Sequence, residues 1–182
     1  MIRGIFFIIG TLFLLYFSRR SLKNPDVHGF YRFFVFEGIL TLILLNHPRW
    51  FMNPFSPLHC ISWFLLAASI FFVINALISL RRHGGHAQRE SSPENHSFEN
   101  TVQVVEDGLY SFVRHPMYSF LLFLAWGAFL KHITLINIVL ILVISALLVA
   151  TAKIEEKENI RFFGVAYTNY MRHSRMFIPW IF

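Results

Sequence analysis

The sequence predicts an all-α integral membrane protein with about five transmembrane helices. Of its 182 residues 55% are hydrophobic, 22 are Phe and only 14% are charged, a composition too apolar for a soluble domain of this length. The apolar residues gather in five runs, at about 2–17, 30–45, 60–80, 118–130 and 133–152. Since a helix needs roughly 17 to 25 residues to cross the hydrocarbon layer, the third and fifth runs have spanning length and the others are slightly short.

Positively charged residues predict how these spans are oriented. With five spans, 13 of the 16 Lys and Arg residues lie on one side of the membrane, and Arg3, Arg49 and Lys131 lie on the other. Because basic residues near the ends of spans are retained in the cytoplasm, the N-terminus is expected outside and the C-terminus in the cytoplasm. A simple five-span chain of this size, whose first apolar run carries no cleavage signal, is typical of a bacterial inner membrane.

Composition along the chain predicts three parts. Residues 1–80 form an N-terminal three-helix transmembrane part, and residues 101–182 form a second part with a transmembrane helical hairpin and a tail. Residues 81–100 are polar and rich in turn formers, which indicates a cytoplasmic linker. The histidines of this linker lack a carboxylate or thiol at helical spacing, so no metal site is expected. The net charge of +6 follows from the cytoplasmic loops and does not indicate a nucleic-acid partner.

A basic motif and an acidic pair flank the predicted hairpin of the fourth and fifth spans. Residues 114–118, Arg-His-Pro-Met-Tyr, stand where the chain enters the membrane, and Glu155 and Glu156 stand where it leaves. Since Lys131 and His132 form a minimal turn, the two spans must be antiparallel neighbours. Both clusters are therefore expected side by side at the cytoplasmic face, as a site for a zwitterionic or mixed-charge ligand.

The start of the fourth span is predicted to hold an anionic group. Pro116 suits the first turn of a helix, where its missing N–H would be unpaired anyway, and free amides with the positive end of the helix dipole would point into the interface beside Arg114 and His115. Each feature alone also fits a structural role: Arg114 as a positive-inside anchor, Tyr110 and Tyr118 as members of an aromatic belt, and the carboxylates as a solvated helix face. Those roles do not explain why both clusters meet at one depth.

The chain after the fifth span is predicted to cover this site. The fifth span continues as a helix into the cytoplasm and ends near Gly164. Aromatic residues follow within 167–179, a pattern typical of a tail that lies along the membrane interface.

A resemblance to a known family rests on motifs in the second half of the chain. These are residues 108–118, Gly-Leu-Tyr-Ser-Phe-Val-Arg-His-Pro-Met-Tyr, followed by Glu155-Glu156, Phe163-Gly164, Tyr167, Tyr170 and Phe177-Ile178-Pro179. In this order and spacing they resemble the isoprenylcysteine carboxyl methyltransferase family and the related phospholipid methyltransferases. The resemblance covers about residues 101–182, and the first three spans match only as generic membrane helices.

The resemblance implies an integral membrane methyltransferase that uses S-adenosylmethionine. The cofactor would enter from the cytoplasm, and a lipophilic or amphipathic acceptor, such as a lipid, would arrive laterally from the bilayer. The cofactor carries a carboxylate, an ammonium and a sulfonium, so it needs basic donors, acidic partners and aromatic faces. By similarity, the cofactor-binding residues would be Tyr110, His115, Pro116, Tyr118, Glu155 and Glu156, and the catalytic residues would be Glu155 and Arg114.

Two positions depart from the family pattern. Phe120 stands where the family commonly has Gly, and Thr151 stands where the prenylcysteine enzymes carry an arginine thought to hold the substrate carboxylate. A prenylcysteine carboxylate is therefore not expected as the acceptor. Two other functions stay open. One is an NADPH-dependent sterol-type membrane reductase, which shares an Arg-His-Pro-x-Tyr segment but usually has Asn where this chain has Met117. The other is a non-catalytic membrane subunit.

Overall fold

The computed structural model describes residues 2–85 and 101–181, and the elements within them are helical. The helices are α1 (Ile2–Ser18), α2 (His28–Asn46), α3 (Pro57–His83), α4 (Pro116–Phe129), α5 (Leu135–Phe163) and α6 (Val165–His173). Short 3-10 helices are η1 (Ser21–Lys23), η2 (His47–Arg49) and η3 (Gly108–Ser111). Among the described residues no strand occurs, although Val113 and Arg175 form an isolated parallel bridge. The predicted all-α class is confirmed.

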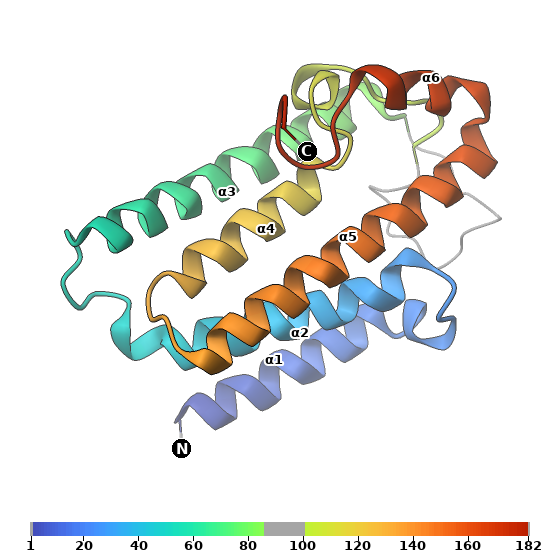
Figure 1. Cartoon of the computed structure of the whole chain (residues 1–182). Coiled ribbons are helices and arrows are strands. Elements are labelled where there is room, and N and C mark those ends of the chain that lie inside the picture. Colours follow the sequence, from blue (N-terminus) through green and yellow to red (C-terminus); the bar gives the residue numbers. More distant parts are fainter. Residues whose placement is uncertain (1, 86–100, 182) are drawn as a thin grey trace.

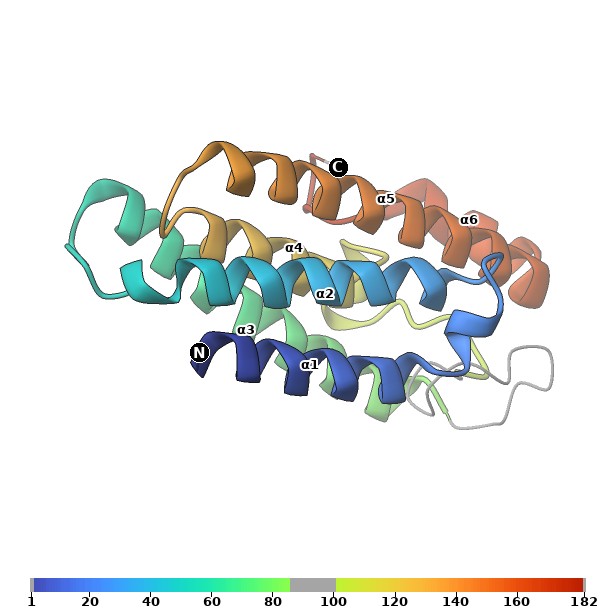
Figure 2. The same cartoon turned by 90° about the horizontal axis from the view of Figure 1, so that it is seen from below.

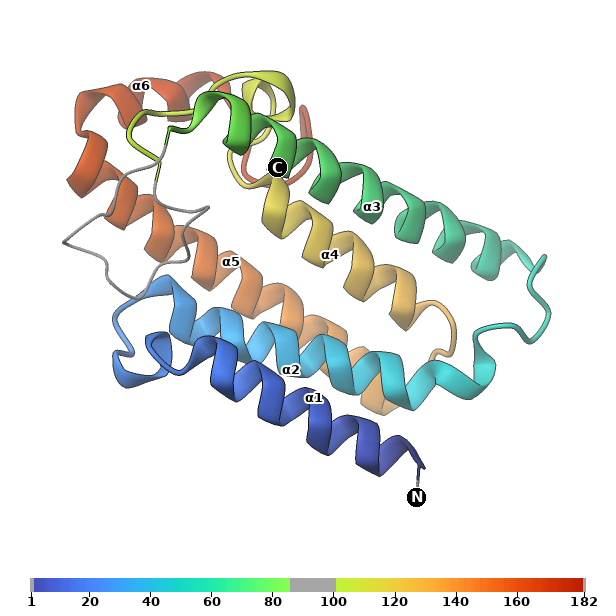
Figure 3. The ribbon, with the colours of Figure 1, turned by 180° about the vertical axis from the view of Figure 1, so that it is seen from behind.

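The long helices run side by side, with α4 between α3 and the pair formed by α2 and α5 (Figure 1 and Figure 3). α1 packs on the outer side of α2 (Figure 2). The main hydrophobic core joins α2, α4 and α5 through residues such as Leu42, Ala125 and Ile144. On the other side of α4, Gly127 permits close contact with α3, since a Cβ there would lie 2.8 Å from Cγ of Leu66. The bundle therefore places α4 at its centre.

Three helical segments are long and apolar enough to cross a membrane, namely His28–Arg49, Pro57–His83 and Leu135–Phe163. α1, with 17 residues, and α4, with 14, are apolar but shorter. The predicted spanning length of the third and fifth apolar runs is thus confirmed. The second run is longer than predicted, because the chain continues from α2 into η2 and reaches Arg49. The total of five spans and their orientation stay predictions.

Polar side chains hold the end of the bundle at which α4 turns into α5. Asn46, the last residue of α2, donates from Nδ2 to the carbonyl of Ala128 at 2.8 Å and accepts at Oδ1 from Nδ2 of Asn137 at 2.7 Å. Thr134 caps α5 by accepting the backbone N–H of Asn137 at 3.2 Å. As predicted, α4 and α5 are neighbours joined by a short turn (Figure 1). The cap explains why α5 starts at Leu135, two residues after the apolar run begins.

The opposite end of α5 extends past the apolar run and anchors α2. α5 has 29 residues and ends at Gly164, as predicted. Gly164 adopts a φ of +61°, a left-handed conformation that glycine reaches without steric cost, and the chain turns there into α6. On the same extension, Glu158 accepts the backbone N–H of His28 at 3.0 Å and lies 2.6 Å from its Nδ1. This carboxylate therefore caps the first turn of α2 and fixes it against α5.

Candidate active site

The C-terminal tail, which follows α6, forms backbone hydrogen bonds with the basic motif of residues 114–118 at the start of α4. The backbone N–H of Arg114 donates to the carbonyl of Arg175 at 2.6 Å, and that of His115 donates to the carbonyl of Met176 at 3.2 Å. The N–H of Arg175 returns a bond to the carbonyl of Phe112 at 2.9 Å. The motif and the tail therefore form a single unit, although about 60 residues separate the two backbone partners in sequence.

This pairing changes one expectation from the sequence. The backbone amides of Arg114 and His115 bond the tail, and those of Tyr118 and Ser119 both bond the carbonyl of His115 at 2.9 Å. Pro116, at the first position of α4, is buried and has no N–H. Of the amides at the start of α4, only that of Met117 has no backbone acceptor among the described residues, so fewer free amides face an anionic group than the sequence analysis expected.

Arg114 and Glu156 form a buried ion pair beneath the motif. Nε of Arg114 lies 2.8 Å from Oε1 of Glu156, and the two side chains are 11% and 10% exposed. Nη1 of Arg114 also donates to the carbonyls of Met171, at 3.3 Å, and Ser174. Nε2 of His115 lies 3.4 Å from the same carboxylate oxygen. This network ties α5, the motif and the tail together.

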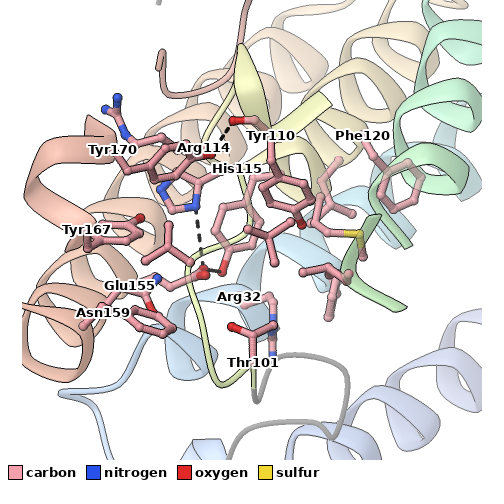
Figure 4. Close-up of a pocket in the computed structure, with 18 of the residues that line it drawn as sticks. Arg32, Thr101, Tyr110, Arg114, His115, Phe120, Glu155, Asn159, Tyr167 and Tyr170 are labelled. Carbon is pink, nitrogen blue, oxygen red and sulfur yellow. Dashed lines mark hydrogen bonds and ion pairs between the residues drawn. The ribbon is translucent and has the colours of Figure 1, made fainter. Parts of the chain in front are cut away.

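Glu155, the neighbour of Glu156 in the acidic pair, points the other way, into a cavity (Figure 4). Its side chain is 28% exposed, and its Oε2 lies 3.9 Å from Nδ1 of His115. The hydroxyl of Tyr118 donates to the same oxygen. The rings of His115 and Tyr118 are stacked, with centroids 5.4 Å apart. The acidic pair is therefore divided, with Glu156 in a structural network and Glu155 at the cavity wall.

The cavity has a volume of about 160 Å³ and draws its walls from α1 to α6. Its polar end carries Glu155, His115 and four tyrosines, which are Tyr110, Tyr118, Tyr167 and Tyr170 (Figure 4). The remaining walls are mostly apolar and come from the first four helices and the segment before η3. They include Phe17, Phe36, Leu80, Val104, Val105, Met117, Phe120 and Leu121. The space thus joins a polar, acidic and aromatic end to a hydrophobic one.

Two tyrosines from α6 close the polar end. The hydroxyl of Tyr170 donates to the carbonyl of Tyr110 at 2.6 Å, and the rings of Tyr167 and Tyr170 lie 5.8 Å apart. Burial raises the pKa of Tyr167 and Tyr170 above the ordinary tyrosine value, because a phenolate would lose its hydration. Both hydroxyls therefore stay neutral at physiological pH. The predicted covering of the site by the tail agrees with this placement.

The structure brings most of the predicted site residues together. Tyr110, Arg114, His115, Tyr118 and Glu155 line the cavity. Pro116 and Glu156, which the sequence analysis also assigned to the cofactor, do not line it, and Glu156 instead pairs with Arg114.

Two departures from the family pattern have different structural places. Phe120 lines the cavity, where its ring occupies part of the wall. Thr151 is fully buried and donates to the carbonyl of Leu147 at 2.7 Å, within α5. Only the departure at Phe120 therefore alters the shape of the site.

Sequence reasoning missed the cavity residues that come from the first half of the chain and from the extension of α5. Arg32, on α2, is buried and lines the cavity near Thr101 (Figure 4). The sequence pattern that could have identified Arg32 is a basic residue inside an apolar run. In a membrane helix such a residue indicates a functional role more often than an anchoring role. Asn159 and Phe163 follow Glu155 at one and two helical turns and line the same wall. Helical spacing from the acidic pair would have identified both.

The protein is therefore a helical bundle with helices long and apolar enough to cross a membrane, and it has a polar site at one end of the bundle. The model of the phospholipid methyltransferase family matches residues 57–166, more than half of the chain, and the chain belongs to this family. It is similar to methanethiol S-methyltransferase of Pseudomonas deceptionensis, with 26% identity over 119 residues, which are 65% of this chain and 42% of that protein. The chain thus spans less than half the length of this relative. No solved structure matches the chain.

The family match confirms the resemblance to membrane methyltransferases and widens it. It begins at residue 57 and therefore includes α3, which the sequence analysis treated as a generic membrane helix. It ends at residue 166, before Tyr167 and Tyr170. The two tyrosines of α6 are therefore assigned to the site by the cavity that they line.

Proposed function

We propose that this protein is an integral membrane methyltransferase that uses S-adenosylmethionine and transfers its methyl group to a lipophilic or amphipathic acceptor. The observation that carries the proposal is the environment of Glu155. Within the matched family region, this accessible carboxylate faces a cavity whose polar end carries tyrosines and whose other walls are mostly apolar. The proposal includes five spans, a cytoplasmic C-terminus and a site that opens on the cytoplasmic side, because the basic residues are distributed in that sense.

The polar end of the cavity fits the positive groups of the cofactor. When bound, S-adenosylmethionine supplies a methyl group that its sulfonium already activates. Glu155 offers a carboxylate to an ammonium, and the faces of Tyr110, Tyr118 and Tyr167 offer negative ring surfaces to a sulfonium. Because the tyrosines stay neutral, they add these ring faces without adding charge.

The residues of the site mainly position the reacting groups and exclude water. Tyr118 donates to Glu155 and His115 stacks on Tyr118, so the carboxylate has a fixed orientation. Arg114, with its ion pair to Glu156, holds the motif against the tail and acts as a positioning residue. Methyl transfer is an in-line displacement, for which alignment of the acceptor and exclusion of water supply most of the rate.

The apolar walls support a lipophilic acceptor. Phe17 of α1, Phe36 of α2 and Phe120 of α4 face the same space as Glu155. These helices belong to the bundle's apolar segments, which suits an acceptor that is dissolved in the bilayer. The names of the family and of the relative point to two acceptor classes, a phospholipid and a small thiol.

The test is methyl transfer from S-adenosylmethionine labelled in its methyl group. Purified protein in lipid nanodiscs is supplied with a phospholipid extract or with a small alkyl thiol, and label is counted in the organic or volatile fraction. We expect label in at least one fraction and its loss in Glu155→Gln. Absence of label in both fractions, from protein that binds S-adenosylhomocysteine, contradicts the proposed acceptor class. If folded protein does not bind S-adenosylhomocysteine, the proposal that the protein uses S-adenosylmethionine is contradicted.

A further inference from the structure

A second polar site lies at the other end of the bundle, and its centre is a buried lysine. Lys131 stands in the turn between α4 and α5, next to the start of α3 and the end of α2 (Figure 1). The residue is only 2% exposed, and its Nζ has no hydrogen-bond partner in the described part of the chain. An ammonium carries three N–H donors, and burying it without an acceptor is costly. The lysine therefore needs a partner that the described protein groups do not supply.

Two tryptophans surround the ammonium. Nζ of Lys131 lies 3.1 Å from the ring centroid of Trp63 and 5.7 Å from that of Trp50. The aromatic faces stabilise the positive charge but accept no conventional hydrogen bond. The indole Nε1 of Trp50 is itself a buried donor without an acceptor. Lys131 and Trp50 thus each bury a donor that no described protein group satisfies.

The surroundings of Lys131 are basic. The residue lines a pocket of about 280 Å³ together with Arg49, His59 and His132. No Asp or Glu occurs in residues 46–63 or 130–137, which build this end of the bundle. The only side-chain acceptor that the structure gives to the guanidinium of Arg49, among the described residues, is the weakly accepting sulfur of Met52, at 3.6 Å. Burial lowers the pKa of Lys131, because the charged ammonium loses part of its hydration.

We infer that this pocket binds a phosphate-type oxyanion, held by Lys131 and Arg49, which both line it. The flexible stem of Lys131 lets its ammonium move from the face of Trp63 toward such a group in the pocket. Exposed apolar residues line part of the pocket, namely Met52, Leu58 and Ile133. Aromatic and basic side chains together are typical of the membrane–water interface. The headgroup of an anionic phospholipid is therefore the favoured source of the phosphate, and free phosphate is the other.

The site is separate from the cavity of Glu155. None of the residues that line one pocket lines the other, and they occupy opposite ends of α4 and α5 (Figure 3). The inference does not rest on the proposed enzymatic activity, since it uses only charge, burial and unsatisfied donors at the turn.

The test measures the binding of three probes to the full chain in detergent. Binding is detected by native mass spectrometry and by the shift of the thermal unfolding transition. The probes are phosphatidylglycerol, zwitterionic phosphatidylcholine and inorganic phosphate. We expect phosphatidylglycerol to bind most tightly, and Lys131→Gln to weaken it about tenfold or more. Lys153→Gln removes the same charge from an exposed position on α5 and serves as the matched control, with unchanged binding.

Each outcome decides the inference. Binding of phosphate that depends on Lys131, with no preference between the two lipids, supports the oxyanion site and assigns it to a soluble ion. Equal binding of the anionic probes by the wild type and by Lys131→Gln overturns it. If Lys131→Gln does not fold, Arg49→Gln at the exposed rim of the pocket replaces it. That variant is expected to weaken phosphatidylglycerol binding severalfold, and unchanged binding overturns the inference.

Discussion

Substitution of Gln for Glu is expected to have different effects at the two adjacent glutamates of α5. Glu156 is 10% exposed and pairs with Arg114 at 2.8 Å. Removing one partner of a buried ion pair costs about 3–5 kcal/mol, because the remaining charge stays buried. Two backbone carbonyls still accept from Arg114, so we expect Glu156→Gln to lower the free energy of unfolding by about 3 kcal/mol, at the lower end of that range.

Glu155→Gln is the matched control for this prediction. Its side chain is 28% exposed, and the amide oxygen of Gln can still accept from Tyr118. We therefore expect a loss of about 1 kcal/mol or less in the free energy of unfolding. The same variant should lose binding of S-adenosylhomocysteine, whose amino group it no longer neutralises. Glu156→Gln is thus expected to act on stability and Glu155→Gln on ligand binding.

The assay is equilibrium unfolding of the detergent-solubilised protein in increasing sodium dodecyl sulfate, followed by circular dichroism. Arg114→Met completes a double-mutant cycle with Glu156→Gln, and the coupling energy between them is expected to be about 2 kcal/mol. A coupling energy near zero contradicts the structural role of the ion pair. Equal destabilisation by the two glutamate variants contradicts the division of the acidic pair.

Three further predictions concern the tyrosines and the turn. Tyr170→Phe removes the hydrogen bond to Tyr110 and should lower the free energy of unfolding by about 1 kcal/mol, measured in the same titration. Asn137→Ala leaves Oδ1 of Asn46 unsatisfied at a buried position and should cost about 1–3 kcal/mol, with unchanged binding of S-adenosylhomocysteine at the far end. The raised pKa of Tyr167 and Tyr170 means that the folded state holds their protons more tightly than the unfolded chain does. Their contribution to stability is therefore complete below about pH 10 and is lost as the pH rises further. Absorbance at 295 nm during alkaline titration should show that these two phenols ionise only with unfolding.

The sequence predicted the hairpin and the meeting of its two polar clusters because both depend on short-range rules. A five-residue turn brings the start of α4 beside the end of α5, and the helical period then determines that adjacent glutamates face different directions. What the sequence could not assign was which glutamate faces the cavity. That choice depends on the rotation of α5 against α2 and α4, which the packing of residues such as Ile144 and Leu148 decides.

The place of Arg32 in the cavity and the pairing of the tail were also beyond the sequence, although Arg32 itself stands out as a basic residue inside an apolar run. Arg32 reaches the cavity only because α2 packs on α5, a contact between segments more than 100 residues apart. The bridge between Val113 and Arg175 joins two irregular segments that carry no strand pattern. Long-range contacts of this kind follow from the whole packing and leave no local signal.

The most direct test of the central claim is calorimetric titration of the wild type and of Glu155→Gln with S-adenosylhomocysteine. We predict one binding site per chain in the wild type, with affinity lowered at least tenfold in Glu155→Gln and no loss of folded protein. Absence of binding by folded wild-type protein would contradict the account, and so would equal affinity in the two proteins.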